Sequence, residues 1–541
     1  MDLIFYNGHV WTGNSKQSLA QAVAVKNDKI FAVGNNEDIL SLEESSSEVV
    51  DLKGRSLLPG FNDSHMHLIG HALTRAKVDL RYCSSIDEVI GAIRDFIDKR
   101  GIAKGEWVYG WGWNQGHFRE KRMPGREDLD RVSTEHCIAI TRTCCHILSA
   151  NSMALQKAGI DREAPVLSGG KVAVDDKGVP NGVLEENAMQ LVTGMQPSLD
   201  GDALKKLIAG AAEDFLAAGL TSVQTDDLGH LGSDLLPVLS KAYRELEEEG
   251  ELPLRVNLQC LLPTEEELKW FLDCGYRTGQ GGAYFKIGPL KLLTDGSLGA
   301  RTALLSEPYG DMPETKGVAV LTSEKLEKLV NLAAEHRMQV AAHAIGDAAV
   351  EMVLDAYKKA AALYPCPDAR YRVVHASLVR PEQIDRFVEQ EVIADVQPAF
   401  TTSDYMLIEQ HFDAKFAGWA YRFKDFINRG IKTAGGSDCP VEDYFPLEGI
   451  HAAVTRQDKS GNPPGGWIPE QRLTLDEALS LYTTGSAYSS FEEEIKGSIT
   501  PGKLADLVML SEDITKVDPG EIKTLKADMT VVGGKIVYSR L

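Results

Sequence analysis

Between residues 200 and 490 the chain alternates short apolar segments with segments of helical periodicity, and this alternation strongly restricts its possible folds. Strand-like segments lie at 221–225, 254–260, 286–293, 338–343, 371–375, 392–397 and 431–436. Helix-like segments lie at 202–218, 233–249, 264–274, 323–336, 347–363, 381–390 and 474–484. Near-continuous apolar strands separated by helices are typical of a parallel sheet covered by helices. We therefore predict an α/β fold, a (β/α)8 TIM barrel, with its active site at the C-terminal ends of the strands.

The two ends of the chain have a different pattern, of short β segments separated by turn residues. Residues 1–55 contain such segments around Asn-Gly, Asn-Asp and Gly-Asn turns, and residues 490–541 contain a Gly-Gly turn between two more. Each end has too few strands to be stable alone. We therefore predict one small β-sandwich built from 1–55 and 490–541, and a barrel at 56–489. The irregular stretch at about 70–200 is interpreted as an insertion in the barrel.

Size and charge limit the partners that this chain can have. A barrel with an accessory domain fits 541 residues, and the formal net charge of −22 argues against nucleic acid. No polybasic stretch suggests binding to an anionic membrane surface. We find no run of about 20 apolar residues and no secretory-signal pattern at the N-terminus. Eight cysteines in so long a chain are not a disulfide framework. We expect a cytoplasmic enzyme with a small-molecule substrate, without a nucleic-acid or membrane partner, and possibly a homodimer.

Two histidines separated by one residue follow an apolar run at residue 60. In an extended strand the side chains of His65 and His67 point the same way, so they can converge on one metal ion. Neutral imidazole is a good metal donor at physiological pH. An H-x-H pair alone is weak evidence, because such pairs occur in any long chain.

Three further ligand-type residues follow predicted strands. His343 and His375 end two of them, and Asp438 follows a third after Gly435-Gly436-Ser437. Alone, each histidine has the simpler interpretation of a packed residue, and the aspartate that of a turn residue or helix N-cap. Together with His65 and His67, however, they form five ligand-type residues at strand ends, where a barrel has its active site. The set therefore predicts a metal centre.

A lysine inside an apolar strand is the candidate for a sixth ligand. Burial disfavours the charged form of Lys291, and a neutral amine can add carbon dioxide to become a carbamate that bridges two cations. The alternative is an ammonium group that reaches a carboxylate or extends to solvent. Lys286 lies in the same strand at odd separation and is expected on the opposite face.

Six segments of the chain resemble the metal-dependent amidohydrolase superfamily, in particular the branch that includes N-substituted formamide deformylase. They are LLPGFNDSHMHL, GPLKLLTDGSLGARTA, QVAAHAIGDAA, RVVHASLV, GGSDCPV and GSITPGKLADLVML. The resemblance implies a TIM barrel with a β-sandwich from both termini. It also implies that His65, His67, His343, His375 and Asp438 are metal ligands, and that Lys291 matches the carbamylated lysine on the family's fourth strand.

The chemistry expected of this set is hydrolysis of a non-peptide, amide-like C–N bond. One or two divalent ions, by default zinc, would activate water and polarise the substrate carbonyl. Asp438 is expected to accept a proton and to return it to the departing amine. The alternatives are a deaminase of a heterocyclic amine with one metal ion, and a non-enzymatic scaffold, which the full set of ligand types makes less attractive.

Three residues are candidate substrate contacts. Trp107, Trp111 and Trp113 are expected on one face of a strand, so Trp113 either packs in a core or lines the pocket. His146, in a segment that resembles one at the family's barrel mouth, is a candidate to bind the substrate carbonyl and is counted with Asp438 as catalytic. Arg301 either binds substrate or forms an ion pair.

Overall fold

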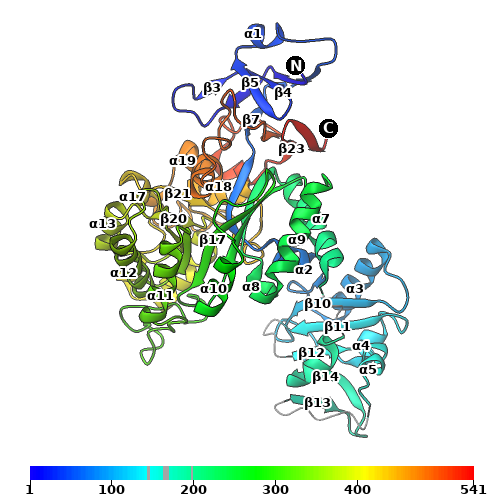
Figure 1. The fold of residues 1–541 in the computed structure, drawn as a ribbon. Helices are drawn as coiled ribbons and strands as arrows, with labels where there is room; N and C mark the ends of the chain where they lie inside the picture. The colour runs from blue at the N-terminus through cyan, green and yellow to red at the C-terminus, as the bar shows by residue number, and fades with distance from the viewer. Residues whose placement is uncertain (143–146, 162–169, 196–198) are drawn as a thin grey trace. The chain divides into compact units, whose positions relative to one another are not determined.

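The computed structural model describes residues 1–142, 147–161, 170–195 and 199–541 of the chain (Figure 1). It divides into two compact units. Unit 1 consists of Met1–Gly70 and Leu204–Leu541, and unit 2 is His71–Ala203, which covers the stretch interpreted as an insertion. Each unit is described by itself below.

Eight parallel strands of unit 1 form one sheet in the order β21-β20-β19-β18-β17-β16-β15-β8. They are β8 (Phe61–Met66), β15 (Leu220–Thr225), β16 (Arg255–Leu261), β17 (Phe285–Leu293), β18 (Val340–Ala344), β19 (Arg372–His375), β20 (Ile393–Val396) and β21 (Thr433–Gly435). Spatial order follows sequence order, as in a singly wound barrel. This arrangement confirms the predicted (β/α)8 fold.

Helices connect successive barrel strands. They include α7 (Gly201–Ala217), α9 (Leu236–Glu248), α10 (Glu265–Asp273), α11 (Ser323–Glu335), α12 (Asp347–Leu363), α13 (Pro381–Glu389), α17 (Phe423–Asn428) and α19 (Leu475–Ser480). Local sequence sets several of their starts: at α10, for example, Thr264 and Glu267 form a capping box. The buried face of α12 carries Val350, Val353 and Leu354, at the spacing of an amphipathic helix packed on a sheet.

The barrel closes where the first strand meets the segment after the last. The amide of Asp438 donates to the carbonyl of His65 over 2.8 Å, and the amide of His67 donates to Cys439 over 2.7 Å. The buried carboxylate of Asp63 accepts the amide of Ser437 at 3.0 Å. A side chain at Gly436 would put its Cβ 2.6 Å from the amide nitrogen of His65, so only glycine permits this approach. Barrel closure thus brings Asp438 beside the two histidines of the first strand.

A buried ion pair connects three strands of the barrel. Arg372 and Asp395 are both fully buried and paired, and the guanidinium of Arg372 also donates to the carbonyl of Ser64 over 2.6 Å. The Ser64 hydroxyl donates to the other oxygen of Asp395. These contacts compensate the cost of burying the two charges. Because the three residues come from β8, β19 and β20, they also connect these strands.

Strands from both ends of the chain form two further sheets in unit 1. One has the order β5-β4-β1-β6, with β1 (Leu3–Tyr6), β4 (Ala22–Lys26), β5 (Lys29–Gly34) and β6 (Glu48–Asp51). The other has the order β24-β23-β22-β7-β2-β3, with β2 (His9–Trp11), β3 (Leu19–Ala20), β7 (Ser56–Pro59), β22 (Leu507–Leu510), β23 (Ala527–Val532) and β24 (Lys535–Ser539). N- and C-terminal strands therefore lie side by side (Figure 1).

One apolar cluster joins these two sheets, with Phe5 and Val23 from the N-terminal part and Leu507 and Val531 from the C-terminal part. The hairpin between β23 and β24 turns at Gly533 and Gly534, whose φ angles of 55° and 75° suit a two-residue hairpin turn. The sequence analysis begins the barrel at residue 56, whereas Ser56–Pro59 pair with β2 and β22 of the terminal sheet.

Unit 2 contains a sheet of its own in the order β13-β14-β12-β11-β10-β9. Its strands are β9 (Val78–Asp79), β10 (Trp107–Trp113), β11 (Cys137–Arg142), β12 (Ile147–Ala150), β13 (Gly170–Val174) and β14 (Pro180–Glu186). The helices include α3 (Ile86–Arg100), α4 (Arg126–Asp130) and α5 (Ser152–Lys157). None of the helices within the described ranges is long and apolar enough to cross a membrane.

Candidate metal centre

Five of the predicted ligands and Lys291 line one cavity of about 460 Å³ in unit 1. The five are His65, His67, His343, His375 and Asp438. They come from β8, β18, β19 and the segment after β21, so all lie toward the C-terminal ends of the strands. The Nε2 atoms of His67 and His65 are 3.1 and 3.3 Å from one oxygen of Asp438. One nitrogen or oxygen from each of these three residues lies within 4.8 Å of the others, close enough to share one ion.

Each of the four imidazoles has one ring nitrogen within hydrogen-bond distance of an oxygen atom that belongs to none of the five predicted ligands. Nδ1 of His65 is 2.9 Å from Gln259 Oε1, Nδ1 of His67 is 2.7 Å from the carbonyl of Asp226, and Nδ1 of His375 is 2.7 Å from Gln397 Oε1. When the ring donates N–H to such an oxygen, the opposite nitrogen keeps its lone pair for a metal ion. These three rings therefore offer Nε2.

His343 is oriented the other way. Its Nε2 lies 3.1 Å from the carbonyl of Gly296 and 3.3 Å from the carboxylate of Asp295, which leaves Nδ1 as the lone-pair donor. The two oxygens of Asp295 also accept the amides of Ile345 and Gly346 at 3.1 and 2.8 Å. Asp295 thus fixes both the ring of His343 and the loop that follows it.

Burial and neighbouring charges set the protonation of this cluster. Burial, and next the charge of Lys291, hold the pKa of His65 well below its usual value, and burial lowers the pKa of His375 to about 3. Burial would also lower the pKa of His67, but the hydrogen bond and charge of Asp438 raise it to about 9. Burial alone would raise the pKa of Asp438, and His67 and His375 hold it below its usual value. The rings of His65 and His375 are therefore neutral, and a metal ion held by His67 and Asp438 would displace the proton between them.

The backbone at two of these residues is in an uncommon conformation. Asp438 has a φ of 58° and His375 a φ of 75°, a region that non-glycine residues rarely occupy. Such strain persists only where surrounding structure determines it, and it is concentrated at functional sites. Here the hydrogen bonds of the barrel closure hold Asp438 in place.

Lys291 is one of the residues that line the cavity, and it is 1% exposed. Its Nζ is 3.5 Å from His65 Nε2 and 3.5 Å from the carboxylate of Asp226. Both sequence interpretations remain compatible with this placement, because the amine reaches a carboxylate and also adjoins the metal ligands.

Lys286, the competing lysine of β17, lies away from this cavity and pairs with Glu492 at 2.7 Å. The other oxygen of Glu492 is 2.6 Å from Lys496, whose amine donates to the hydroxyl of Ser222 in β15. Burial alone would raise the pKa of Glu492, but the charges of Lys496 and Lys286 lower this pKa to about 2. Lys286 therefore takes part in stabilising the barrel.

This triad predicts a pH-dependent stability. Because the folded-state pKa of Glu492 is depressed from 4.5 to about 2, its contribution is full above pH 4.5 and is lost as the pH falls toward 2. The contribution is on the order of 3 kcal/mol. We expect the difference in unfolding free energy between wild type and Glu492→Gln to be largest at pH 7 and to shrink below pH 4.5 in denaturant titrations.

The control is Glu324→Gln on α11, which removes an exposed partner of Lys328. It should leave stability unchanged throughout, because exposed pairs contribute little. A gap between wild type and Glu492→Gln that is the same at pH 7 and at pH 3 would rule out the assigned pKa shift.

The candidate substrate contacts have different outcomes. Trp113 is fully buried in an apolar cluster of unit 2, and its indole donates to the carbonyl of Ile140 over 3.1 Å, which favours core packing. Trp107 packs against another cluster, so the prediction that Trp107, Trp111 and Trp113 share a face is wrong. The reason is a register shift between Trp111 and Trp113, where Gly112 has a φ of 91° and the strand bulges.

Arg301 forms an ion pair with Asp311 at 2.8 Å, and it also donates to the carbonyls of Leu298 and Gly299. Of the two alternatives from the sequence, substrate binding or an ion pair, the structure therefore shows the ion pair. His146 lies outside the described residues.

Four residues that orient the ligands were not predicted: Asp226, Gln259, Asp295 and Gln397. Each lies within or just after a barrel strand, toward its C-terminal end. A polar residue at the C-terminal end of a predicted strand, the pattern that identified His343 and His375, would have been enough to predict that these four residues lie near the site.

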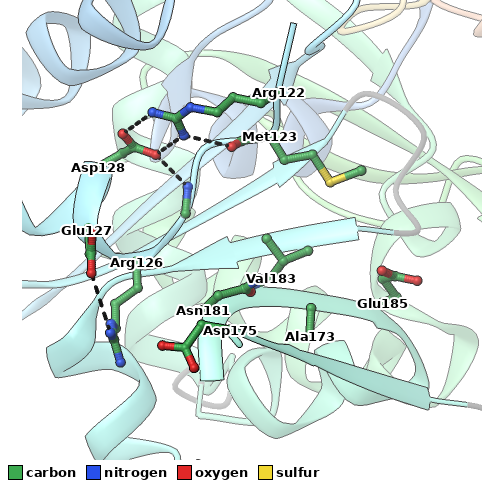
Figure 2. Close-up of a pocket in the computed structure, with 11 residues that line it drawn as sticks. Arg122, Met123, Arg126, Glu127, Asp128, Ala173, Asp175, Asn181, Val183 and Glu185 are labelled. Carbon is green, nitrogen blue, oxygen red and sulfur yellow. Dashed lines mark hydrogen bonds and ion pairs between the residues drawn. The ribbon is translucent and has the colours of Figure 1, made fainter. Parts of the chain in front are cut away.

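A second cavity, of about 470 Å³, lies in unit 2 beside α4 and β14 (Figure 2). Four of its charged side chains form two pairs: Arg122 binds Asp128 at 2.5 and 2.8 Å, and Arg126 is 3.9 Å from Glu127. Its lining residues include neither histidine nor cysteine. Of these two cavities, the one in unit 1 is therefore the one that offers imidazole donors.

The family model described as "Amidohydrolase family" matches residues 48–538. The chain belongs to the amidohydrolase family. The YtcJ amidohydrolase of Bacillus subtilis is 34% identical to it over all of both chains, and N-substituted formamide deformylase of Arthrobacter pascens is 28% identical over 100% of this chain and 98% of that protein. An uncharacterized metal-dependent hydrolase from Pyrococcus furiosus, 30% identical, superposes with a TM-score of 0.75 over 96% of this chain and 99% of its own.

Membership of this family confirms the resemblance inferred from the six sequence segments and the prediction of an enzyme that hydrolyses carbon–nitrogen bonds. It also agrees with the donor chemistry of the cavity, where the group of His65, His67 and Asp438 suits a divalent metal ion. The amidohydrolase is thus a metal-dependent hydrolase.

Proposed function

We propose that this amidohydrolase cleaves a non-peptide, amide-like C–N bond of a small molecule at a metal centre formed by His65, His67, His343, His375 and Asp438. The observation that carries the proposal is the orientation of the four imidazoles. Each bonds one nitrogen to an outside oxygen, and all four line the same cavity with Asp438. Nitrogen-rich sites with room for substrate favour zinc.

A bound divalent ion would supply an activated water molecule and polarise the substrate carbonyl. The residues of the chain perform the proton transfers. Asp438 accepts the proton of the attacking water through the carboxylate that now faces His65 and His67, and it returns that proton to the departing amine nitrogen. If two ions are bound, carbon dioxide on Lys291 provides a carbamate as the sixth ligand.

The rest of the cavity wall supports a substrate with an apolar part. Leu293, Leu298, Ile345 and Phe400 contribute apolar surface. The carboxylates of Asp404 and Glu442 lie on the same wall and can accept hydrogen bonds from N–H groups. Together with the similarity to N-substituted formamide deformylase, this lining favours N-substituted formamides and related N-acyl or cyclic amides.

The test starts with elemental analysis of the purified protein, which counts ions per chain. The metal-loaded enzyme is then offered N-alkyl and N-aryl formamides, acetamides and cyclic amides, with release of amine or ring opening as the readout. We expect turnover in at least one class, and a rate at least about 100-fold lower with Asp438→Asn under the same conditions. Release of ammonia from an aminoheterocycle by a protein with one ion would favour the deaminase instead. No turnover of any amide at full metal occupancy would refute the proposal.

A further inference from the structure

Asp226 lies directly after β15 and contacts two of the proposed ligands through different atoms. Its main-chain carbonyl is 2.7 Å from Nδ1 of His67, and one oxygen of its carboxylate is 3.5 Å from Nζ of Lys291. The other carboxylate oxygen accepts the amide of Gly229 at 3.1 Å, and the residue is 1% exposed. The amide of Asp226 donates to the carbonyl of Met66 over 2.8 Å, which ties it to β8.

We propose that Asp226 is a positioning residue of the metal centre, which orients His67 through its carbonyl and Lys291 through its carboxylate. The inference rests on the proposed metal centre and deepens it. It adds to the five ligands and Lys291 a residue that touches neither substrate nor ion.

The contact with His67 determines which ring nitrogen faces the cavity. Because a carbonyl oxygen can only accept, Nδ1 of His67 must carry a proton, so Nε2, which lies beside Asp438, is the nitrogen left to bind a metal ion once its own proton is displaced. Partners of this kind hold metal-binding imidazoles in one tautomer and one orientation.

The contact with Lys291 constrains the amine in either of its forms. As an ammonium group, Lys291 donates an N–H to Asp226. If the neutral amine attacks carbon dioxide, an N–C bond forms, one proton leaves to solvent and the carbamate nitrogen keeps a single N–H. Because the carbamate is planar, an acceptor for that N–H sets the plane in which its two oxygens lie. The carboxylate of Asp226, 3.5 Å from Nζ of Lys291, is placed to be this acceptor.

The neighbouring carboxylate, Asp227, is a matched control. It is also fully buried, but its oxygens accept from the amide of Ile69 at 2.9 Å, the hydroxyl of Thr225 at 2.6 Å and the hydroxyl of Tyr243 at 2.6 Å. These contacts stabilise the loop and do not include Lys291. Replacing either aspartate by asparagine removes one buried charge from the same segment.

The experiment compares wild type, Asp226→Asn, Asp226→Glu and Asp227→Asn. Metal affinity is measured by competition with a chromophoric chelator, and the carbon dioxide on Lys291 by intact mass under native, neutral conditions. All variants keep the main-chain carbonyl at position 226, so Asp226→Asn isolates the effect of the carboxylate. Melting temperatures report the general stability of each protein.

We expect Asp226→Asn to raise the metal dissociation constant about 10- to 100-fold and to lower the fraction of chains that carry carbon dioxide. Asp226→Glu should recover most of the affinity, because its carboxylate can still reach the amine. Asp227→Asn should lower the melting temperature and keep the wild-type affinity. If the wild-type protein binds one ion and no carbon dioxide, the metal dissociation constants alone test the positioning role of Asp226.

Two results would overturn this role for Asp226. One is an unchanged dissociation constant in Asp226→Asn. The other is a loss of metal affinity in both Asp226→Asn and Asp227→Asn that follows the decrease in their melting temperatures. Such a result would show that both variants lose affinity because they are less stable. A wild-type protein that binds no metal would instead overturn the proposed function itself, so the two failures can be told apart.

Discussion

Replacing Asp438 by asparagine is expected to lower kcat about 10²- to 10⁴-fold, the range by which a well-placed acid–base group accelerates a reaction. The amide of asparagine keeps the size of the side chain and an oxygen donor, but it cannot accept and return a proton. Asp438 lies 3.1 and 3.3 Å from the Nε2 atoms of His67 and His65, so its carboxylate is beside the nitrogens that would hold the ion. The measurement is kcat and KM on the amide identified in the substrate screen, with metal content determined on the same samples.

The control for this variant is Asp443→Asn. Asp443 is an exposed carboxylate on the segment that follows Asp438, and it pairs with Lys459 at 2.9 Å. It should retain the wild-type kcat. If Asp438→Asn holds a full complement of metal and turns over at close to the wild-type rate, then Asp438 is not the proton carrier.

Removal of the metal ions is expected to lower activity by at least about two orders of magnitude, and zinc should restore it. Stability should fall as well, because an ion that binds only the folded state adds about 4 kcal/mol at a concentration 1,000-fold above its dissociation constant. In the metal-free protein the charge of Asp438 is still balanced by His67, whose pKa it raises to about 9. The fold should therefore persist with a lower melting temperature. Dialysis against a chelator, followed by calorimetry and activity assays, measures both effects.

Two histidine variants sharpen this experiment. His67→Asn should reproduce the effect of the chelator on activity. His336→Asn at the C-terminal end of α11, whose Nδ1 is 3.0 Å from the carbonyl of Leu332, should respond to chelator and zinc as wild type does. Full activity after verified removal of metal would exclude a metal-dependent mechanism.

Strand periodicity and chain order predicted the barrel because both are local properties of the sequence. The apolar segment at 286–293 corresponds to β17 (Phe285–Leu293), and 371–375 corresponds to β19 (Arg372–His375). Since parallel barrel strands end on the same side, the position of His343 or His375 after a strand was enough to predict which end of the barrel it occupies. No such rule predicts which side-chain atom faces the cavity.

What the sequence did not predict depends on contacts between distant segments. The outward nitrogen of His65 is held by Gln259, 194 residues away, and Lys286 is held by Glu492, 206 residues away. The bulge at Gly112, which separates Trp113 from Trp107, also requires the register of two strands to be known. In each case the deciding partner lies in a different element, and nothing in the local sequence pattern indicates it.

The seam of the barrel has a consequence for how the enzyme matures. The carboxylate of Asp63 reaches the amide of Ser437 across 374 residues, and the same seam brings Asp438 beside His65 and His67. A nascent polypeptide that stops short of this point carries both histidines of the first strand but has no carboxylate to accompany them. In the proposed metal centre, the ion would therefore bind these three side chains only after nearly the whole barrel has been synthesised, and partly translated chains would lack one of its ligands.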